Sequence, residues 1–241
     1  MIDKSSLGKH ISKEFNEEIE DLRERVLSMG GIVEQLLSDA VEALASGRAP
    51  DFKEVKAEDR KVNTLEVSID ESIAELIARR QPTASDLRLV LTVSRIIVDL
   101  ERIGDEAKKV YKMATRLTDA RGRHADAFTE AENLGLHVQK MLRGALDGFA
   151  RMDPEAALRV AREDDKVDRE HEEIIRLNMT YMLEDARNIK RAVDLMWAVR
   201  ALERIGDHAR NIGEHTIYMV TGQDVRYVDI ARVEEIVRDA Q

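Results

Sequence analysis

The sequence predicts an all-α protein made of two tandem three-helix bundles that are copies of one unit. Two observations lead to this fold class: a composition suited to long amphipathic helices, and an internal repeat whose copies share one heptad pattern. The chain of 241 residues has 3 prolines, 12 glycines and 4% aromatic residues, with 36% charged and 43% hydrophobic residues. Few helix breakers and many charges on an apolar background are typical of long helices with one buried face.

The prolines separate the predicted helices. Pro50 opens the second helix, Pro82 lies between the second and the third, and Asp153 is a predicted N-cap with Pro154 at the first helical position. We expect helices at residues 8–47, 51–80, 84–119, 125–151, 154–184 and 188–221, and a short one from about residue 228. Residues 118–124 are the expected linker between the two halves.

The internal repeat consists of two pairs of matching segments. Residues 100–105 (Leu-Glu-Arg-Ile-Gly-Asp) recur without change at 202–207, an offset of 102 residues. Residues 58–63 (Glu-Asp-Arg-Lys-Val-Asn) match residues 163–168 (Glu-Asp-Asp-Lys-Val-Asp) at an offset of 105. Two matches in the same order indicate a duplicated unit of three helices. We therefore assign the first repeat to residues 8–120, the second to 125–222, and a C-terminal tail with a short helix to 223–241.

Both copies of the third helix carry a heptad seam, with spacings that alternate between three and four residues. The first seam is Leu89, Val93, Ile96, Leu100, Ile103, Ala107, Val110, Ala114 and Leu117. The second seam is Leu195, Ala198, Leu202, Ile205, Ala209, Ile212, Thr216 and Met219. Seams of this kind pack against neighbouring helices that run nearly parallel or antiparallel.

Each half carries four oxygen-bearing side chains, in pairs four residues apart on its second and third helices. The first set is Asp59, Asn63, Glu101 and Asp105, and the second set is Asp164, Asp168, Glu203 and Asp207. Residues four apart share a helix face, so neighbouring second and third helices would gather each set. With Leu100 at an a position, the third-helix acids fall at b and f. We therefore expect them to be exposed beside the seam.

These sets have two interpretations. Oxygen-only ligands suit hard cations such as Mg²⁺, Ca²⁺, Mn²⁺ or ferric iron. The alternative is a solvated acidic face with ordinary salt bridges, and Lys109, four residues after Asp105, is placed for one. The second set has four carboxylates, whereas the first has three and the neutral Asn63, so the second is expected to bind cations more strongly.

Two histidines lie near the second set. His208 follows Asp207 and is turned about 100° around the helix from it, so we expect a surface role for His208. His171 lies three residues beyond Asp168 on the same stripe and is a weak ligand candidate.

Charge and composition exclude several classes of function. The net charge of −10 argues against a general nucleic-acid binder and against attraction to an anionic membrane surface. The absence of cysteine excludes disulfides and thiolate zinc sites. The first residues lack the apolar core of a signal peptide, and no apolar run approaches the roughly 18 residues that span a bilayer. We expect a cytoplasmic protein without direct membrane insertion.

The chain resembles the PhoU family of bacterial phosphate-signalling regulators, most specifically at residues 78–90, 100–105, 162–168, 180–185 and 203–207. The resemblance covers nearly the whole chain and implies two three-helix bundles with E/D-xxx-D metal motifs. These motifs map onto the two sets defined above, with Mg, Mn, Fe and Zn ions as the candidate metals. Asn63 departs from the fully acidic pattern.

The resemblance also implies negative control of the phosphate-starvation (Pho) response and modulation of phosphate uptake. The implied partners are the cytoplasmic ATP-binding subunit of the high-affinity phosphate ABC transporter and a membrane sensor histidine kinase, and the implied assembly is a homodimer. No enzymatic activity and no nucleic-acid partner are expected.

Two alternative functions stay open: a metal-binding helical bundle of the di-metal carboxylate type, and a purely structural coiled-coil adaptor. Di-metal oxidases use Glu-x-x-His pairs that project into the bundle core. In this chain the residue three positions after Glu101 is Gly104, and the one three positions after Glu203 is Gly206. Glycine in place of histidine argues against a di-metal oxidase. The sequence also lacks a phosphate-binding loop of the GxxxxGK type.

Overall fold

The computed structural model describes residues 4–47, 52–82, 84–117 and 125–240, and these residues form helices and connecting turns without a β-strand. The helices are α1 (Lys4–Ser46), α2 (Phe52–Arg80), α3 (Ala84–Arg116), α4 (Ala125–Arg151), α5 (Pro154–Glu184), α6 (Ile189–Thr221) and α7 (Ile230–Asp239), with a short 3₁₀ helix, η2 (Ala186–Asn188), before α6. The predicted all-α class is confirmed. No helix within the described ranges is both long and apolar enough to cross a membrane.

The observed helix bounds agree closely with the predicted ones. The first helix begins at Lys4 rather than at residue 8, and the third ends at Arg116. Pro50, the end of the predicted 84–119 helix and the predicted linker at 118–124 lie outside the described residues. Asp153 caps α5 as expected, because its Oδ1 accepts hydrogen bonds from the backbone N–H groups of Glu155 and Ala156 at 2.9 and 3.0 Å.

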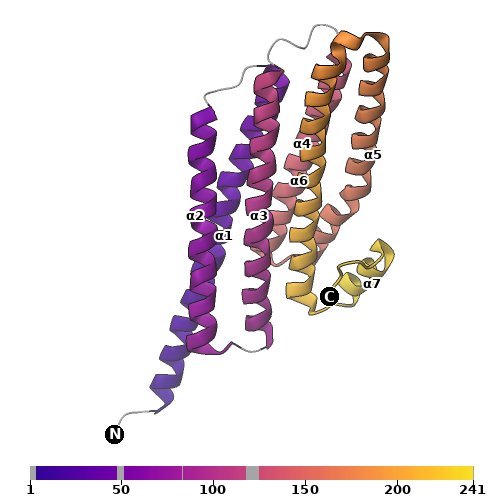
Figure 1. The fold of residues 1–241 in the computed structure, drawn as a ribbon. Coiled ribbons are helices and arrows are strands. Elements are labelled where there is room, and N and C mark those ends of the chain that lie inside the picture. Colours follow the sequence, from indigo (N-terminus) through magenta and orange to yellow (C-terminus); the bar gives the residue numbers. More distant parts are fainter. Residues whose placement is uncertain (1–3, 48–51, 83, 118–124, 241) are drawn as a thin grey trace.

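The helices form two three-helix bundles that lie side by side (Figure 1). Helices α1, α2 and α3 make up the first bundle, and α4, α5 and α6 make up the second, with α7 against the second bundle. The largest contact between any two helices joins α3 to α6, which run in opposite directions. The prediction of two tandem three-helix bundles is therefore confirmed.

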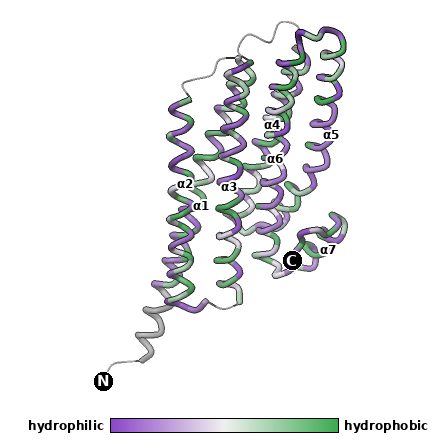
Figure 2. Tube along the Cα trace, in the orientation of Figure 1, coloured by the Kyte–Doolittle hydropathy of each residue, from purple (hydrophilic) through white to green (hydrophobic). Residues whose placement is uncertain are grey.

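One hydrophobic core runs through both bundles. Every predicted seam residue of α3 and α6, and Leu117 just beyond α3, is buried. Most of the buried apolar residues of the six long helices form a single cluster, and the hydrophobic residues in Figure 2 lie mainly where the helices meet. Because α3 and α6 each pack against their own bundle and against each other, more than one face of each helix is buried.

Three glycines differ in how closely a neighbouring helix approaches. A Cβ at Gly30 of α1 would lie 2.7 Å from Cδ2 of Leu146 on α4, so this position permits a close crossing. A Cβ at Gly206 would lie 3.1 Å from Cγ1 of Val167, whereas one at Gly104 would lie 3.8 Å from Cγ1 of Val62. Val62 and Val167 are equivalent at the repeat offset of 105. Both halves therefore make the same helix contact, and the second makes it more tightly.

Candidate functional site

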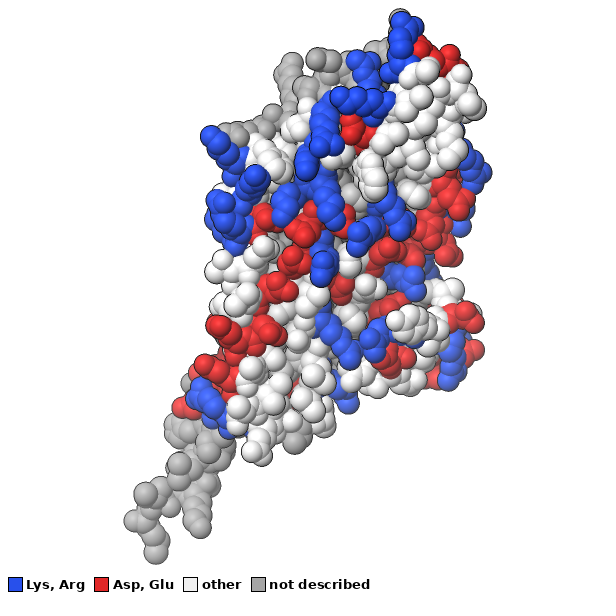
Figure 3. Space-filling view, viewed as in Figure 1, with Lys and Arg blue, Asp and Glu red and all other residues white. Residues whose placement is uncertain are grey.

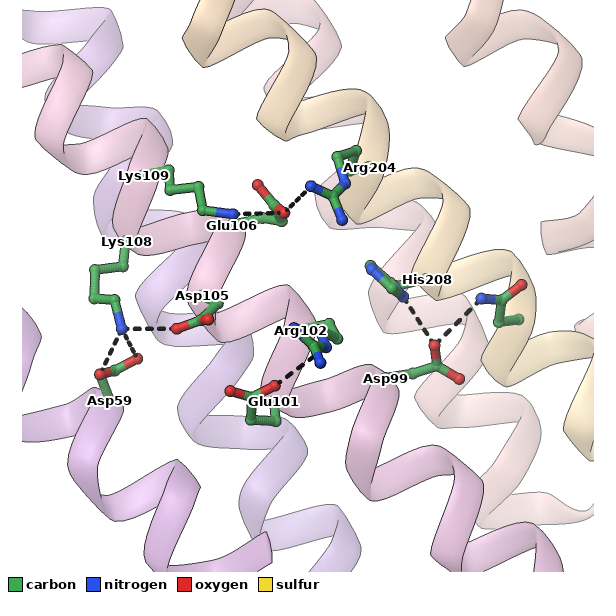
Figure 4. Close-up of polar contacts among 11 residues, drawn as sticks. Asp59, Asp99, Glu101, Arg102, Asp105, Glu106, Lys108, Lys109, Arg204 and His208 are labelled. Carbon is green, nitrogen blue, oxygen red and sulfur yellow. Dashed lines mark hydrogen bonds and ion pairs between the residues drawn. The ribbon is translucent and has the colours of Figure 1, made fainter.

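In the first half, two of the three acidic side chains of the set contact one lysine (Figure 4). Nζ of Lys108 lies 2.8 and 2.7 Å from the two carboxylate oxygens of Asp59 and 2.7 Å from Oδ1 of Asp105. The expected pairing of Lys109 with Asp105 is wrong, because residue 108 is the one that reaches α2. Lys109 binds Glu106 instead, at 2.9 Å. The structure brings Asp59 and Asp105 together, but both already pair with the same side-chain cation.

The other two members of the first set lie at its edge. Glu101 is half-buried, and its Oε2 lies 3.6 Å from Nε of Arg102. Burial, and then repulsion from Asp105, raises the pKa of Glu101. Asn63 is exposed and forms no hydrogen bond with the other three among the described side chains. The first set is thus a cluster of three acids with its own lysine.

In the second half, only two of the four carboxylates pair with a cationic side chain of the described residues. Nη1 of Arg210 donates to Oδ2 of Asp164 at 2.7 Å, and Nη1 of Arg200 donates to Oε1 of Glu203 at 2.6 Å. The other oxygen of Glu203, Oε2, is buried and has no hydrogen-bond partner in the described part of the chain. Asp168 and Asp207 are not hydrogen-bonded or ion-paired to any described side chain.

Burial and mutual repulsion raise the pKa values of the second set. Burial, followed by the charges of Asp207, Asp168 and Asp164, raises the pKa of Glu203 to about 7. Burial also raises the pKa of Asp207, with further contributions from Asp164 and Asp168. For Asp164, burial outweighs the nearby guanidinium and raises the pKa. Glu203, Asp207 and Asp164 are therefore each influenced by the charge of at least one other member of the set.

The expectation that the third-helix acids are exposed is wrong. Glu203 is only 7% exposed, and Asp207 is half-buried, as are Glu101 and Asp105. The physical reason is that each of these helices packs against three other long helices: α3 against α1, α2 and α6, and α6 against α3, α4 and α5. Side chains beside the seam are therefore partly covered as well.

The repeat extends to the cation that binds each second-helix acid. Lys108 and Arg210 are equivalent at the offset of 102, and their partners Asp59 and Asp164 are equivalent at the offset of 105. The same pairing therefore recurs in both halves, between different types of cation. This ion pair gives side-chain support to the duplication inferred from the sequence.

The acids do not form a ready metal site as they are placed. No three His, Asp or Glu side chains in the described ranges are arranged so that they could hold a metal ion. In the first half Lys108 already supplies the positive charge. The second half fits a cation better, because Asp168, Asp207 and the buried oxygen of Glu203 lack a counter-charge. Burial and then the charge of Arg200 lower the pKa of His171, which favours the neutral ring that a metal would need.

A buried polar cluster joins α3 to α6, and nothing in the sequence pattern predicted it (Figure 4). Oδ1 of Asp99 lies 2.8 Å from Nδ1 of His208 and 3.2 Å from Nδ2 of Asn211, and its Oδ2 lies 3.3 Å from Nε2 of His215. Burial by itself would raise the pKa of Asp99, but hydrogen bonds with the two histidines outweigh it, so the pKa is lowered. The expected surface role of His208 is wrong, because its ring packs between the halves. The internal repeat could not have predicted this cluster, because the residue equivalent to Asp99 in the second half is Ala201.

A second polar contact between the halves lies further along the same helices. Glu106 of α3 is buried, and its Oε1 lies 2.9 Å from Nζ of Lys109 and 2.9 Å from Nη1 of Arg204 on α6. Glu106 and Asp99 together place two buried carboxylates of α3 against cationic or histidine side chains of α6. Truncating the partners of Asp99, or those of Glu106, would leave that buried carboxylate without a counter-charge.

Known proteins match both halves of the chain. The family model described as "PhoU domain" matches residues 26–114 and 131–216. The "Phosphate-specific transport system accessory protein PhoU homolog" of Pseudomonas aeruginosa is 48% identical over 239 residues, which cover 99% of this chain and 98% of the relative. The "Phosphate-specific transport system accessory protein PhoU" of Escherichia coli K12 is 48% identical over 227 residues, which cover 94% of this chain and 93% of the relative.

Solved structures share the arrangement of helices. The crystal structure of PhoU from Pseudomonas aeruginosa has a TM-score of 0.83 at 48% identity, and the match covers 87% of this chain and all of that one. The phosphate transport system regulatory protein PhoU from Streptococcus pneumoniae has a TM-score of 0.80 at 26% identity, covering 88% and 99%. The helix arrangement is thus similar even where three residues in four differ.

Proposed function

Because the chain belongs to the PhoU family, we propose that it is an accessory protein of a phosphate-specific transport system. The observation that carries this proposal is the 48% identity, over both halves, to relatives of that name. We further propose that it keeps the phosphate-starvation response off while phosphate is plentiful, and that it modulates phosphate uptake. Such a role requires binding surfaces, and we propose no enzymatic activity.

The proposed partners are the ATP-binding subunit of the phosphate ABC transporter and a sensor histidine kinase. The names of the relatives support association with the transport machinery. The outer faces of the helices are rich in charge, which suits reversible contacts with partner proteins. A homodimer and a cytoplasmic location stay predictions.

Deletion of the gene in the organism that carries it tests the regulatory role. We expect a reporter of phosphate-starvation genes to stay on in phosphate-rich medium, because the link between transporter and kinase is missing. Returning the intact gene on a plasmid is the control and should restore repression. Normal repression in the deletion strain would contradict the proposal.

We also propose that the second set, Asp164, Asp168, Glu203 and Asp207, binds a hard cation more strongly than the first. The support is the difference in counter-charge: each acid of the first set pairs with Lys108 or Arg102, whereas two carboxylates of the second have no cationic partner among the described residues. A bound cation would relieve the repulsion that raises the pKa of Glu203.

Calorimetric titration with Mn²⁺ or Mg²⁺ tests this difference between the halves. Glu203→Ala/Asp207→Ala is expected to lose the stronger site, and the matched variant Glu101→Ala/Asp105→Ala is expected to keep it. Affinity should fall as salt is added, since part of the site faces solvent. Circular dichroism checks that both variants stay helical. Equal binding by the wild type and the second-half variant would mean that these acids do not bind the metal.

A further inference from the structure

An open groove between α2 and α3 carries mainly cationic side chains. The groove has a volume of about 450 Å³, and Lys56, Arg60, Lys108, Lys109 and Lys112 line it together with Phe52 and one acid, Asp59. We call it the basic groove. Figure 3 shows Lys and Arg side chains gathered over the upper ends of α2 and α3, in a chain whose net charge is −10.

Three of these cations have no acidic partner. Asp59 is already bound by Lys108, and Lys109 binds Glu106. Lys56 lies over the ring of Phe52, 5.0 Å from its centroid, and within the described ranges neither it nor Arg60 nor Lys112 pairs with a carboxylate. No described carboxylate pairs with these three side chains, so solvent and dissolved ions provide most of their counter-charge.

The equivalent groove of the second half is covered by α7. Ala161, Asp164, Arg210 and Glu214 line a cavity there together with residues of α7, and they are the repeat equivalents of Lys56, Asp59, Lys108 and Lys112. Val233 and Val237 of α7 pack into an apolar cluster with residues of α5 and α6, and Nε of Arg162 donates to Oε1 of Glu234 at 2.9 Å. A helix lying across this groove is thus a mode of packing that the fold itself uses.

The two grooves differ in chemistry at the equivalent positions. Ala161 is replaced by Lys56, Asp165 by Arg60, and Glu214 by Lys112. The apolar positions under α7 change as well: Leu158 corresponds to Lys53, and Ile217 to Thr115. A helix that occupied the basic groove would have to present carboxylates where α7 presents valine and isoleucine.

We propose that the basic groove is the docking site for an acidic helical segment of a partner protein, which lies where α7 lies in the second half. Lys56 with Arg60, and Lys108 with Lys112, form two rows of cations with four-residue spacing on neighbouring helices. A helix with acidic residues every three or four positions matches both rows, because one turn covers about 5.4 Å on either partner. Binding held by exposed charges is fast, salt-dependent and reversible.

A peptide based on α7 tests the proposal without knowledge of the natural partner. The probe has the sequence of residues 229–240 with Val233→Glu, Ile236→Glu and Val237→Glu, is held helical by a lactam bridge, and carries a fluorophore for anisotropy. We expect it to bind the full chain, and Lys56→Glu/Arg60→Glu to weaken binding at least tenfold. The matched control Lys190→Glu/Arg191→Glu makes the same charge change at exposed positions of α6 and should bind within twofold of the wild type.

Three further probes distinguish an acidic helix from other anions: a scrambled peptide, polyphosphate and phosphatidylglycerol vesicles. A scrambled peptide of the same composition, with its glutamates spread around the helix, should bind at least fivefold more weakly. Equal binding by both charge-reversed proteins, equal binding of the scrambled peptide, or no binding of the probe would overturn the proposal. Loss of polyphosphate or phosphatidylglycerol-vesicle binding in the groove variant, without peptide binding, would overturn it in favour of a non-protein polyanion. Circular dichroism confirms the fold of each variant.

Discussion

Glu203 combines burial with repulsion from Asp207, Asp168 and Asp164 of the second acidic set. One of its oxygens pairs with Arg200, while the other is buried without a partner, and Asp207 adds its negative charge nearby. The pKa of about 7 follows from these surroundings. A carboxyl of this kind exchanges its proton near neutral pH, so binding of a cation at this site would be coupled to proton release.

Replacing Glu203 by glutamine should make stability less dependent on pH. The folded-state pKa is raised from 4.5 to about 7, so the stability gained from the protonated form is full below pH 4.5 and is lost as the pH rises through about 7. We expect Glu203→Gln to be more stable than the wild type at pH 8, by about 1–3 kcal/mol, and close to it at pH 4.5. Urea unfolding with EDTA present measures both values.

The half-buried Glu101 provides the comparison for this prediction. The pKa of Glu101 is raised by the same two causes, burial and a neighbouring carboxylate, but the charges of Arg102 and then Lys108 oppose this shift. Glu101→Gln should therefore gain less at pH 8 than Glu203→Gln. An equal effect of Glu203→Gln at both pH values would show that the charge of Glu203 does not cost stability in the folded protein.

At the scale of helices, the two copies of the repeat make the same glycine–valine contact, but the valine leaves less room for a larger side chain in the second copy. Gly104 and Gly206 occupy the same position of α3 and α6, and each faces a valine of the preceding helix, Val62 or Val167. The valine approaches more closely in the second half. Glycine weakens a helix by about 1 kcal/mol relative to alanine, so its presence in α6 is explained by packing rather than by helix propensity.

Alanine at these two glycines should have different effects on stability. Gly104→Ala meets only ordinary contact at 3.8 Å and should raise the free energy of unfolding by up to about 1 kcal/mol. Gly206→Ala would place a methyl group 3.1 Å from Cγ1 of Val167, so it should gain nothing or lose about 1 kcal/mol. Urea unfolding of both variants at one pH measures the difference. A larger gain for Gly206→Ala would contradict the closer packing of the second half.

At the scale of the whole molecule, the two bundles share one core and divide their charge unevenly. The contact of α3 with α6 buries the polar cluster of Asp99 and the ion pairs of Glu106 between the halves. The net charge of −10 is a sum over the chain, and it conceals the basic groove at one end of α2 and α3. The first bundle leaves this groove open, whereas α7 covers its equivalent in the second.

The sequence by itself determined the helices, the duplication and the seams, because these depend on local periodicity and on breakers such as Pro82 and Pro154. Spacing also predicted that Asp164, Asp168, Glu203 and Asp207 come together. Only the tertiary structure decided that Lys108 pairs with two acids of the first set, that Glu203 is buried, and that His208 binds Asp99. Heptad positions describe one helix against its own bundle. The packing of α3 on α6 depends on contacts between distant parts of the chain, which local periodicity does not encode.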